Sequence, residues 1–295
     1  MQDLNWRSIG LVVALLSIPV SFTPSLAADR KDDTLPPTGR IRLFQSNDRV
    51  LVMMRIGAGE LVPMVFDTGS DGHSFDTLIV TRNHLRKVGT TVEIDGSTGQ
   101  RRTLPTFAIP DVSIGGLRAG RIIGVSLDYD RDDAMGIISP EMFRGRLVSV
   151  DFSANRADVL TKTPAHIPAG ASTAYQGGLP ATEVKTPDGS ITFANFDTGF
   201  NGEISLPIAM MKNVPMMTAA SIVGKYQTIN AEGLVYGAQI RGDIAVGPLV
   251  LKNPRVTFIG DVMNIGLPLM RRLKIVLDPA GKRTWVSCAS GAEHC

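Results

Sequence analysis

Cysteine and histidine are scarce in this chain, and their scarcity narrows the chemistry that it can perform. The 295 residues include two cysteines and four histidines. The histidines show no ligand-like spacing, so the sequence indicates no metal site, and we expect no other cofactor. Neither cysteine lies in the setting of a catalytic thiol and no Gly-x-Ser-x-Gly motif is present, so serine- and cysteine-based hydrolysis are not indicated.

The chain also lacks a strong net charge, and its body lacks a long apolar run. The formal net charge is +2, and the basic residues are dispersed apart from short groups such as Arg101-Arg102 and Arg271-Arg272. Such groups are typical of a solvated surface, so we expect no nucleic-acid partner. Beyond the N-terminus, no run reaches the roughly 20 apolar residues that a membrane-spanning helix needs.

Residues 1–27 have the organisation of a secretory signal peptide. Arg7 precedes an apolar stretch over residues 9–20, and the small residues of Ser25-Leu26-Ala27 follow that stretch. We expect cleavage after Ala27 and export of the protein, to the periplasm or outside the cell, with no stable membrane insertion afterwards. An uncleaved anchor is the alternative, because Asp3 offsets the charge of Arg7.

The most informative feature is a tetrapeptide that occurs twice. Phe-Asp-Thr-Gly stands at residues 66–69 and again at residues 196–199, so that Asp67 and Asp197 lie 130 residues apart. A given tetrapeptide of this kind is expected by chance at on the order of 1 in 100,000 positions. The repeat therefore favours duplication of a unit that supplies one carboxylate to a shared site. The alternative is an ordinary strand-to-turn sequence.

The neighbourhood of the tetrapeptide is duplicated as well, which is the test of a repeat. Apolar runs flank a glycine-containing turn over residues 50–66, and a Pro-Asp-Gly turn divides residues 181–196. Both segments predict β-hairpins that deliver an aspartate at the end of a strand. Farther on, residues 138–151 and 265–278 each combine an apolar start, a short helical stretch and a strand that ends in aspartate.

These paired motifs resemble those of the aspartic proteases, in a two-lobed arrangement like that of pepsin but with lobes as compact as a retropepsin subunit. In that family each lobe carries a hydrophobic-Asp-Thr-Gly loop and, later, a hydrophobic-hydrophobic-Gly stretch that crosses behind it. The second half matches both parts, whereas the first half has Ser139 opposite Gly266. The resemblance covers residues 45–160 and 180–287. It implies a mostly β, bilobal acid-protease fold with the active-site cleft between two homologous lobes.

The resemblance also implies the site and its chemistry. Asp67 and Asp197 would form a dyad that activates a water, one carboxylate taking a proton while the other donates one. Two adjacent carboxylates cannot both ionise readily, so they share one proton. The residues implied to support the two loops are Thr68, Gly69, Ser70, Thr198 and Gly199, with the two threonines exchanging hydrogen bonds between the lobes.

The position after each Asp-Thr-Gly triplet breaks the symmetry. We expect Ser70 to donate a hydrogen bond to the outer oxygen of Asp67 and so to favour its charged form. Phe200, at the matching position, has no donor in its side chain. This difference predicts that Asp67 is the partner that ionises first and that Asp197 carries the proton.

Two further segments predict the hairpin flaps that close over substrate in this family. Residues 91–104 and 226–236 both have a turn between strand-like runs. The first lacks the tyrosine that pepsin-like flaps use, whereas the second contains Tyr226 and Tyr236. Which lobe supplies the flap stays open.

The domain organisation follows from the repeat and from composition. Export would permit a disulfide between Cys288 and Cys295 in the tail, and whether the two are bridged stays open. The expected segments are a signal peptide (1–27), a mobile leader (28–44), an N-terminal aspartic protease lobe (45–160), a linker (161–175), a C-terminal aspartic protease lobe (176–287) and a tail (288–295).

Taken together, the sequence predicts an exported aspartic endopeptidase that acts as a monomer on a polypeptide substrate and needs no cofactor. The competing hypothesis is a catalytically inactive peptide-binding protein of the same fold. It stays open because Ser139 and Phe200 both depart from the family pattern.

Overall fold

The computed structural model describes residues 15–17, 38–45, 49–95, 100–129, 133–227 and 232–289. Over these residues the chain is mostly β, as the sequence predicts. The helices are short and are α1 (Thr77–Arg82), α2 (Leu267–Met270) and the 3-10 turns η1 (Pro140–Phe143) and η2 (Ile208–Lys212). Among the described residues, no helix has the length and apolar character needed to cross a membrane.

The first sheet has nine strands in the spatial order β1-β7-β8-β9-β6-β10-β5-β4-β3. All of them come from the first half of the chain. Their bounds are β1 (Leu15–Ser17), β3 (Phe44–Gln45), β4 (Val50–Ile56), β5 (Leu61–Phe66), β6 (Ser74–Asp76), β7 (Arg86–Asp95), β8 (Arg101–Ile114), β9 (Leu117–Leu127) and β10 (Gly136–Ile138).

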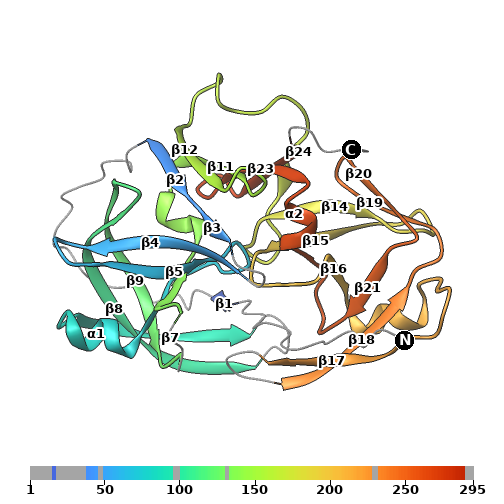
Figure 1. Cartoon of the computed structure of the whole chain (residues 1–295), viewed down its shortest axis with the longest axis horizontal. Helices are drawn as coiled ribbons and strands as arrows, with labels where there is room; N and C mark the ends of the chain where they lie inside the picture. Colours follow the sequence, from blue (N-terminus) through green and yellow to red (C-terminus); the bar gives the residue numbers. More distant parts are fainter. Residues whose placement is uncertain are drawn as a thin grey trace.

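The second sheet also has nine strands, in the order β17-β18-β21-β16-β22-β15-β14-β19-β20, and all of them come from the second half. Their bounds are β14 (Ala181–Lys185), β15 (Ile191–Asp197), β16 (Ile204–Leu206), β17 (Ser221–Gln227), β18 (Glu232–Gln239), β19 (Asp243–Val246), β20 (Leu249–Lys252), β21 (Arg255–Phe258) and β22 (Asn264–Gly266). Figure 1 shows the first sheet on the left and the second on the right.

A third sheet joins the two halves. Its order is β13-β24-β23-β11-β12-β2, with bounds β2 (Gly39–Arg42), β11 (Arg146–Asp151), β12 (Arg156–Thr161), β13 (Thr173–Ala174), β23 (Leu273–Asp278) and β24 (Arg283–Cys288). The two strands that end in aspartate, β11 and β23, pair with each other antiparallel at its centre. These strands lie together at the top of Figure 1, between the other two sheets.

The two halves of the chain repeat the same strand pairing, as the repeated sequence pattern predicts. The hairpins β4–β5 and β14–β15 are both antiparallel. Each aspartate strand then has a parallel neighbour: β5 pairs with β10 through Phe66 and Ile138, and β15 pairs with β22 through Phe196 and Ile265. The hairpins predicted around residues 91–104 and 226–236 are also present, as β7–β8 and β17–β18.

The expected leader needs a correction at its end. Residues 39–42 form β2, which pairs antiparallel with β12, and Ile41 and Leu43 are each 1% exposed. These apolar residues alternate with Arg40 and Arg42, and alternation with a period of two is the pattern of a half-buried strand. The charged and proline-containing surroundings conceal that pattern. The folded part of the chain therefore includes residues that we assigned to a mobile leader.

Other expected boundaries shift less or lie outside the described residues. The expected linker, residues 161–175, contains the strand β13, which pairs with β24. Strand β1 belongs to the expected signal peptide and pairs antiparallel with β7, while the expected cleavage site at Ala27 lies outside the described residues. Cys288 is disulfide-bonded. Cys295, the other cysteine of the chain, lies outside the described residues.

Candidate active site

The two aspartates of the repeated tetrapeptide lie at matching ends of matching strands. Asp67 follows β5 directly and Asp197 is the last residue of β15. The strand β10 supports the first loop, because the Asp67 amide donates a hydrogen bond to the Ile138 carbonyl (2.9 Å). Both aspartates are 1% exposed. An apolar strand followed by a tight Thr-Gly turn thus delivers a buried carboxylate in each half of the chain.

Thr68 and Thr198 connect the two loops by hydrogen bonds, as the family resemblance implies. The Thr68 amide donates to the Thr198 hydroxyl (3.1 Å), and the Thr198 amide donates to the Thr68 hydroxyl (3.3 Å). Each hydroxyl in turn donates to a carbonyl of the opposite strand: Thr68 Oγ1 to Phe196 O (2.8 Å) and Thr198 Oγ1 to Phe66 O (2.7 Å). Four hydrogen bonds between buried groups therefore hold Asp67 and Asp197 in register.

The glycine of each triplet allows the carboxylates to approach the backbone. The Gly69 amide donates to Asp67 Oδ1 and the Gly199 amide donates to Asp197 Oδ1, both at 2.8 Å. A Cβ atom on Gly69 would lie 2.7 Å from both Cγ and Oδ1 of Asp197. The Asp197 carboxyl group therefore lies directly against the Asp67 loop, in a space that only glycine leaves open.

Burial raises the pKa of both carboxyl groups. For Asp67, the negative charge of Asp197 raises the pKa further, and the hydrogen bond from Gly69 opposes this increase. Burial raises the pKa of Asp197 to about 7. Asp197 Oδ2 is buried and has no hydrogen-bond partner among the described residues. A pair of this kind retains a proton at pH values where an exposed aspartate has lost it.

The role expected of Ser70 is not borne out. Its hydroxyl donates to the Gly72 carbonyl (3.0 Å) instead of to Asp67. A serine two residues before an accessible carbonyl can bond locally within its own turn, and here that local acceptor is used. The expectation that Asp67 ionises before Asp197 rested on this donor, and it loses its basis.

Ser139 and Gly266 lie at matching positions behind the two loops, but they make different contacts there. A Cβ atom on Gly266 would lie 2.0 Å from the Gly202 carbonyl oxygen and 2.4 Å from that of Phe200, so glycine is required there. Ser139 is fully buried, and its hydroxyl donates to the Ser70 carbonyl (2.6 Å). The departure at Ser139 therefore adds a hydrogen bond to the Asp67 loop.

Phe200, the other departure, packs within the second half of the chain. It is 2% exposed and clusters with Tyr226, Val235 and Ile259. Tyr226 and Val235 belong to the β17–β18 hairpin, so Phe200 anchors that hairpin to the Asp197 loop. The Tyr226 ring also crosses Gly233, where a Cβ atom would lie 2.6 Å from the ring. Residues 96–99 and 228–231, which join the strands of the two hairpins, lie outside the described residues.

The sequence did not predict a role for two polar residues near Asp67, which are Tyr129 and His73. Tyr129 follows β9, and its hydroxyl shares a hydrogen bond with Ser74. Burial raises the pKa of Tyr129 well above its ordinary value, and the charge of Asp67 contributes. His73 accepts a hydrogen bond at Nδ1 from the Ser139 amide (3.2 Å). Neither residue belongs to a motif, so no local signal in the sequence marks them.

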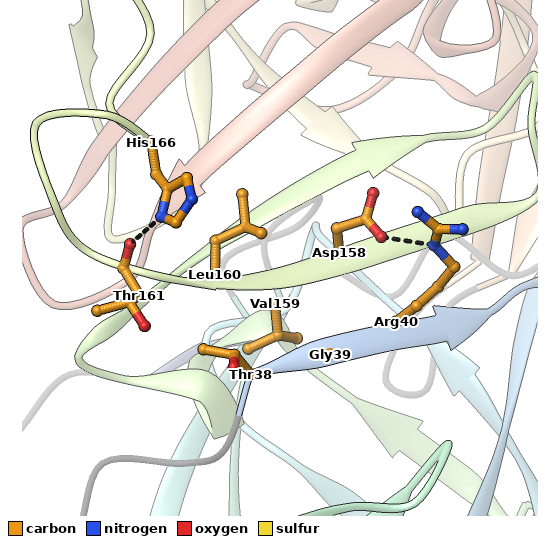
Figure 2. Close-up of a pocket in the computed structure, with 8 residues that line it drawn as sticks. All are labelled: Thr38, Gly39, Arg40, Asp158, Val159, Leu160, Thr161 and His166. Atoms are coloured by element: carbon orange, nitrogen blue, oxygen red, sulfur yellow. Dashed lines mark hydrogen bonds and ion pairs between the residues drawn. The ribbon is translucent and has the colours of Figure 1, made fainter.

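A pocket elsewhere in the molecule is lined by neither Asp67 nor Asp197. Its eight lining residues lie along the β2–β12 edge of the third sheet, with His166 at one end (Figure 2). The charged groups there are satisfied, since Arg40 pairs with Asp158 at 2.8 Å and His166 Nδ1 bonds to the Thr161 carbonyl at 2.8 Å. Within the described ranges, no group of three or more His, Cys, Asp or Glu residues is placed to hold a metal ion.

Comparison of the sequence with models of known protein families gave no match, and a search among curated proteins gave none either.

Proposed function

We propose that this chain is an exported aspartic endopeptidase with a bilobal, pepsin-like fold. The observation that carries the proposal is the reciprocal bonding of Thr68 and Thr198, which brings two buried aspartates from separate halves into one site. The bilobal arrangement is supported by two nine-stranded sheets, one from each half, and by the mixed sheet between them.

The proposed chemistry uses one shared proton. One carboxylate of the Asp67–Asp197 pair takes a proton from a water that attacks the scissile carbonyl carbon. The other, protonated carboxyl group donates its proton to the carbonyl oxygen, and a tetrahedral intermediate forms. The first carboxyl group then gives the proton that it took from water to the amide nitrogen, and the second takes a proton back from a hydroxyl group of the intermediate as the C–N bond breaks and the amine leaves. The raised pKa of both aspartates supports this division, because one proton remains on the pair in mildly acidic solution.

The proposed substrate is a polypeptide in extended conformation. Strand β1 pairs antiparallel with β7 through Leu15 and Asp95, which supports the view that the β7 edge accepts an extended segment. Cleavage of the expected signal peptide would remove β1 and leave that edge open to a substrate. We propose that the exported protein then acts as a monomer in the periplasm or outside the cell.

The burial of the aspartates also favours the second candidate, a peptide-binding protein without turnover. With 1% exposure each, Asp67 and Asp197 are accessible to a peptide only if the surrounding hairpins open. If the hairpins instead stay closed over the aspartates, a peptide could bind without reaching them, and no bond would break.

An unbiased peptide library, incubated with the protein from pH 3 to pH 7 and analysed by mass spectrometry, tests the proposal. We expect cleavage that a statine-type transition-state mimic blocks and that a chelator leaves unchanged. Binding of a fluorescent statine peptide without cleavage would support the binding protein instead. The absence of both cleavage and binding would overturn both candidates.

A further inference from the structure

His73 links the strand that crosses behind the Asp67 loop to the segment that follows that loop. Its Nδ1 atom accepts a hydrogen bond from the Ser139 amide (3.2 Å). The Ser139 hydroxyl donates to the Ser70 carbonyl (2.6 Å), three residues after Asp67. The His73 carbonyl itself is fixed, because it accepts from the Val125 amide (2.9 Å). A chain of hydrogen bonds therefore runs from β9 through His73 and Ser139 to the Asp67 loop.

The second half of the chain makes the corresponding link without a side chain. There, Gly266 occupies the place of Ser139, and its amide donates to the Glu203 carbonyl (3.0 Å). Glu203 follows Asp197 by the same interval at which His73 follows Asp67. The acceptor is thus a main-chain oxygen in one half and an imidazole nitrogen in the other. Of these two acceptors, only the imidazole can be lost by protonation.

We propose that His73 is a positioning residue that holds the Asp67 loop in its active geometry through Ser139, and that the loop requires His73 to be neutral. A neutral imidazole offers one acceptor nitrogen, and Nδ1 serves in that role here. When His73 is protonated, both ring nitrogens are donors, so that Nδ1–H and the Ser139 amide face each other without an acceptor between them. The hydrogen bond between Ser139 and His73, which supports the Asp67 loop, would then be lost.

The setting of His73 is consistent with a neutral ring over the pH range of interest. Burial lowers the pKa of His73 to about 4, and it is the cause that accounts for the shift. The charged and titratable residues on the surrounding elements are Asp67 and Asp71 of the loop, Asp76 of β6, Arg118 and Arg121 of β9, Asp128 and Tyr129 after it, and Glu141 of η1. No charge among them contributes to the lowered pKa of His73.

This inference rests on the proposed function for its kinetic test, which compares two variants. His73→Asn keeps an acceptor oxygen near the place of Nδ1 and does not titrate in acid, whereas His73→Leu removes the acceptor. We expect His73→Asn to retain kcat at neutral pH within about threefold and to keep, below about pH 4, a larger share of its maximal rate than the wild type keeps. We expect His73→Leu to lower kcat about tenfold or more with little change in KM, because a buried amide is left without an acceptor.

His84→Asn is the matched control. His84 is exposed and has a positive φ of 48°, a conformation that asparagine tolerates well. The control should leave the whole profile unchanged. The proposal is overturned if His73→Asn keeps no larger share of its maximal rate below about pH 4 than His84→Asn does, or if His73→Leu matches the wild type.

A second measurement does not depend on activity. In the Asp67→Asn/Asp197→Asn variant, NMR titration of the His73 ring nitrogens and of the Ser139 amide would follow the hydrogen bond directly. We expect Nδ1 to be unprotonated above about pH 4 and the Ser139 amide resonance to shift with the same midpoint. A Ser139 amide that stays unchanged while His73 titrates would refute the link. If no cleavage is found but the two titrations coincide, the proposed function fails and the coupling of His73 to Ser139 stands.

Discussion

Thr68 and Thr198 are joined by two hydrogen bonds that mirror each other across the two halves of the chain. Each amide donates to the other residue's hydroxyl, at 3.1 Å and 3.3 Å. Each hydroxyl also donates to the carbonyl that precedes the opposite aspartate. The position of one carboxylate is therefore fixed relative to the other by short, buried contacts, and the proposed chemistry depends on that relation.

Removal of one of these hydroxyl groups should lower the free energy of unfolding. Thr198→Val leaves the Thr68 amide without its acceptor and the Phe66 carbonyl without its donor. Each unsatisfied buried group costs about 1 to 3 kcal/mol, so we expect the loss of these two partners to lower the free energy of unfolding by roughly 2 to 6 kcal/mol. Urea denaturation measures this loss.

Thr198→Ser is the control, because it keeps the hydroxyl group and removes only a methyl group. It should lose less than half as much stability as Thr198→Val. The double variant Thr68→Val/Thr198→Val should lose less than the sum of the single variants, since both remove parts of one network. Strict additivity would show that the two threonines are not energetically coupled.

Gly266→Ala should damage both stability and activity. The added Cβ atom would lie 2.0 Å from the Gly202 carbonyl oxygen, so the Asp197 loop must move. A displacement of about 1 Å costs on the order of 100-fold in rate at a catalytic site. We expect a loss of that size in kcat for the peptide substrate, together with a lower Tm.

Gly89→Ala offers a matched comparison on another strand. There the new Cβ atom would lie 3.3 Å from the Thr106 hydroxyl, which is a side-chain atom that can shift. Its Tm should stay within about 2 °C of the wild type, since surface changes of this kind have small effects on stability. If both glycine variants behave alike, the close approach at Gly266 does not control the loop.

The buried aspartates should make stability depend on pH in a definite direction. Their pKa values are raised on folding, so the folded chain binds protons more tightly than the unfolded chain. This contribution is fully present below the unfolded value of about 3.9 and is lost as the pH rises through the folded value, about 7 for Asp197. Calorimetry should show that Asp67→Asn/Asp197→Asn gains Tm over the wild type from pH 4 to pH 8, reaching roughly 5 °C or more.

Asp188→Asn is a control of opposite sign. Hydrogen bonds from Thr186 and Ser190 lower the pKa of Asp188 to about 2. Its stabilising contribution is present above the unfolded pKa and disappears as the pH falls through about 2, so this variant should lose Tm at neutral pH and approach the wild type in strong acid. A dyad variant whose Tm difference does not grow between pH 4 and pH 8 would contradict the raised pKa values.

Ser70→Ala should leave the acidic limb of the pH–rate profile in place. The Ser70 hydroxyl donates to the Gly72 carbonyl, so its removal takes no hydrogen bond from Asp67. We expect a loss of about 1 kcal/mol in the free energy of unfolding. A shift of the acidic limb by roughly one pH unit would mean that Ser70 bonds to Asp67 when substrate is bound.

The hairpins and both aspartates could be predicted from sequence because their signals are local. Turn residues separate apolar runs at residues 50–66 and 181–196, and the duplicated tetrapeptide marks where each run ends. The strands β4, β5, β14 and β15 follow that pattern. The exchange of bonds between Thr68 and Thr198 was expected from family resemblance, and the structure confirms it.

The remaining features depend on contacts between distant parts of the chain. The short strand β2 exists because β12 provides its pairing partner, and Ile41 and Leu43 alone give a weak signal. The Ser70 hydroxyl donates to the Gly72 carbonyl within its own turn, and the sequence does not distinguish this local acceptor from Asp67. The bond between His73 and Ser139 depends on the pairing of β6 with β10, which brings the two residues together. Tertiary structure decides each of these cases.

The most direct test of the central claim is the rate of peptide cleavage by Asp67→Asn and by Asp197→Asn, measured separately at the pH of maximal wild-type activity. Asparagine fills the same volume and keeps the acceptor oxygen for Gly69 or Gly199, so folding should survive and circular dichroism should match the wild type. If the two aspartates act as one dyad with a shared proton, each variant loses essentially all turnover. Retention of a tenth of the wild-type rate by either variant, on the order of what 1.4 kcal/mol of transition-state stabilisation represents, would contradict that claim.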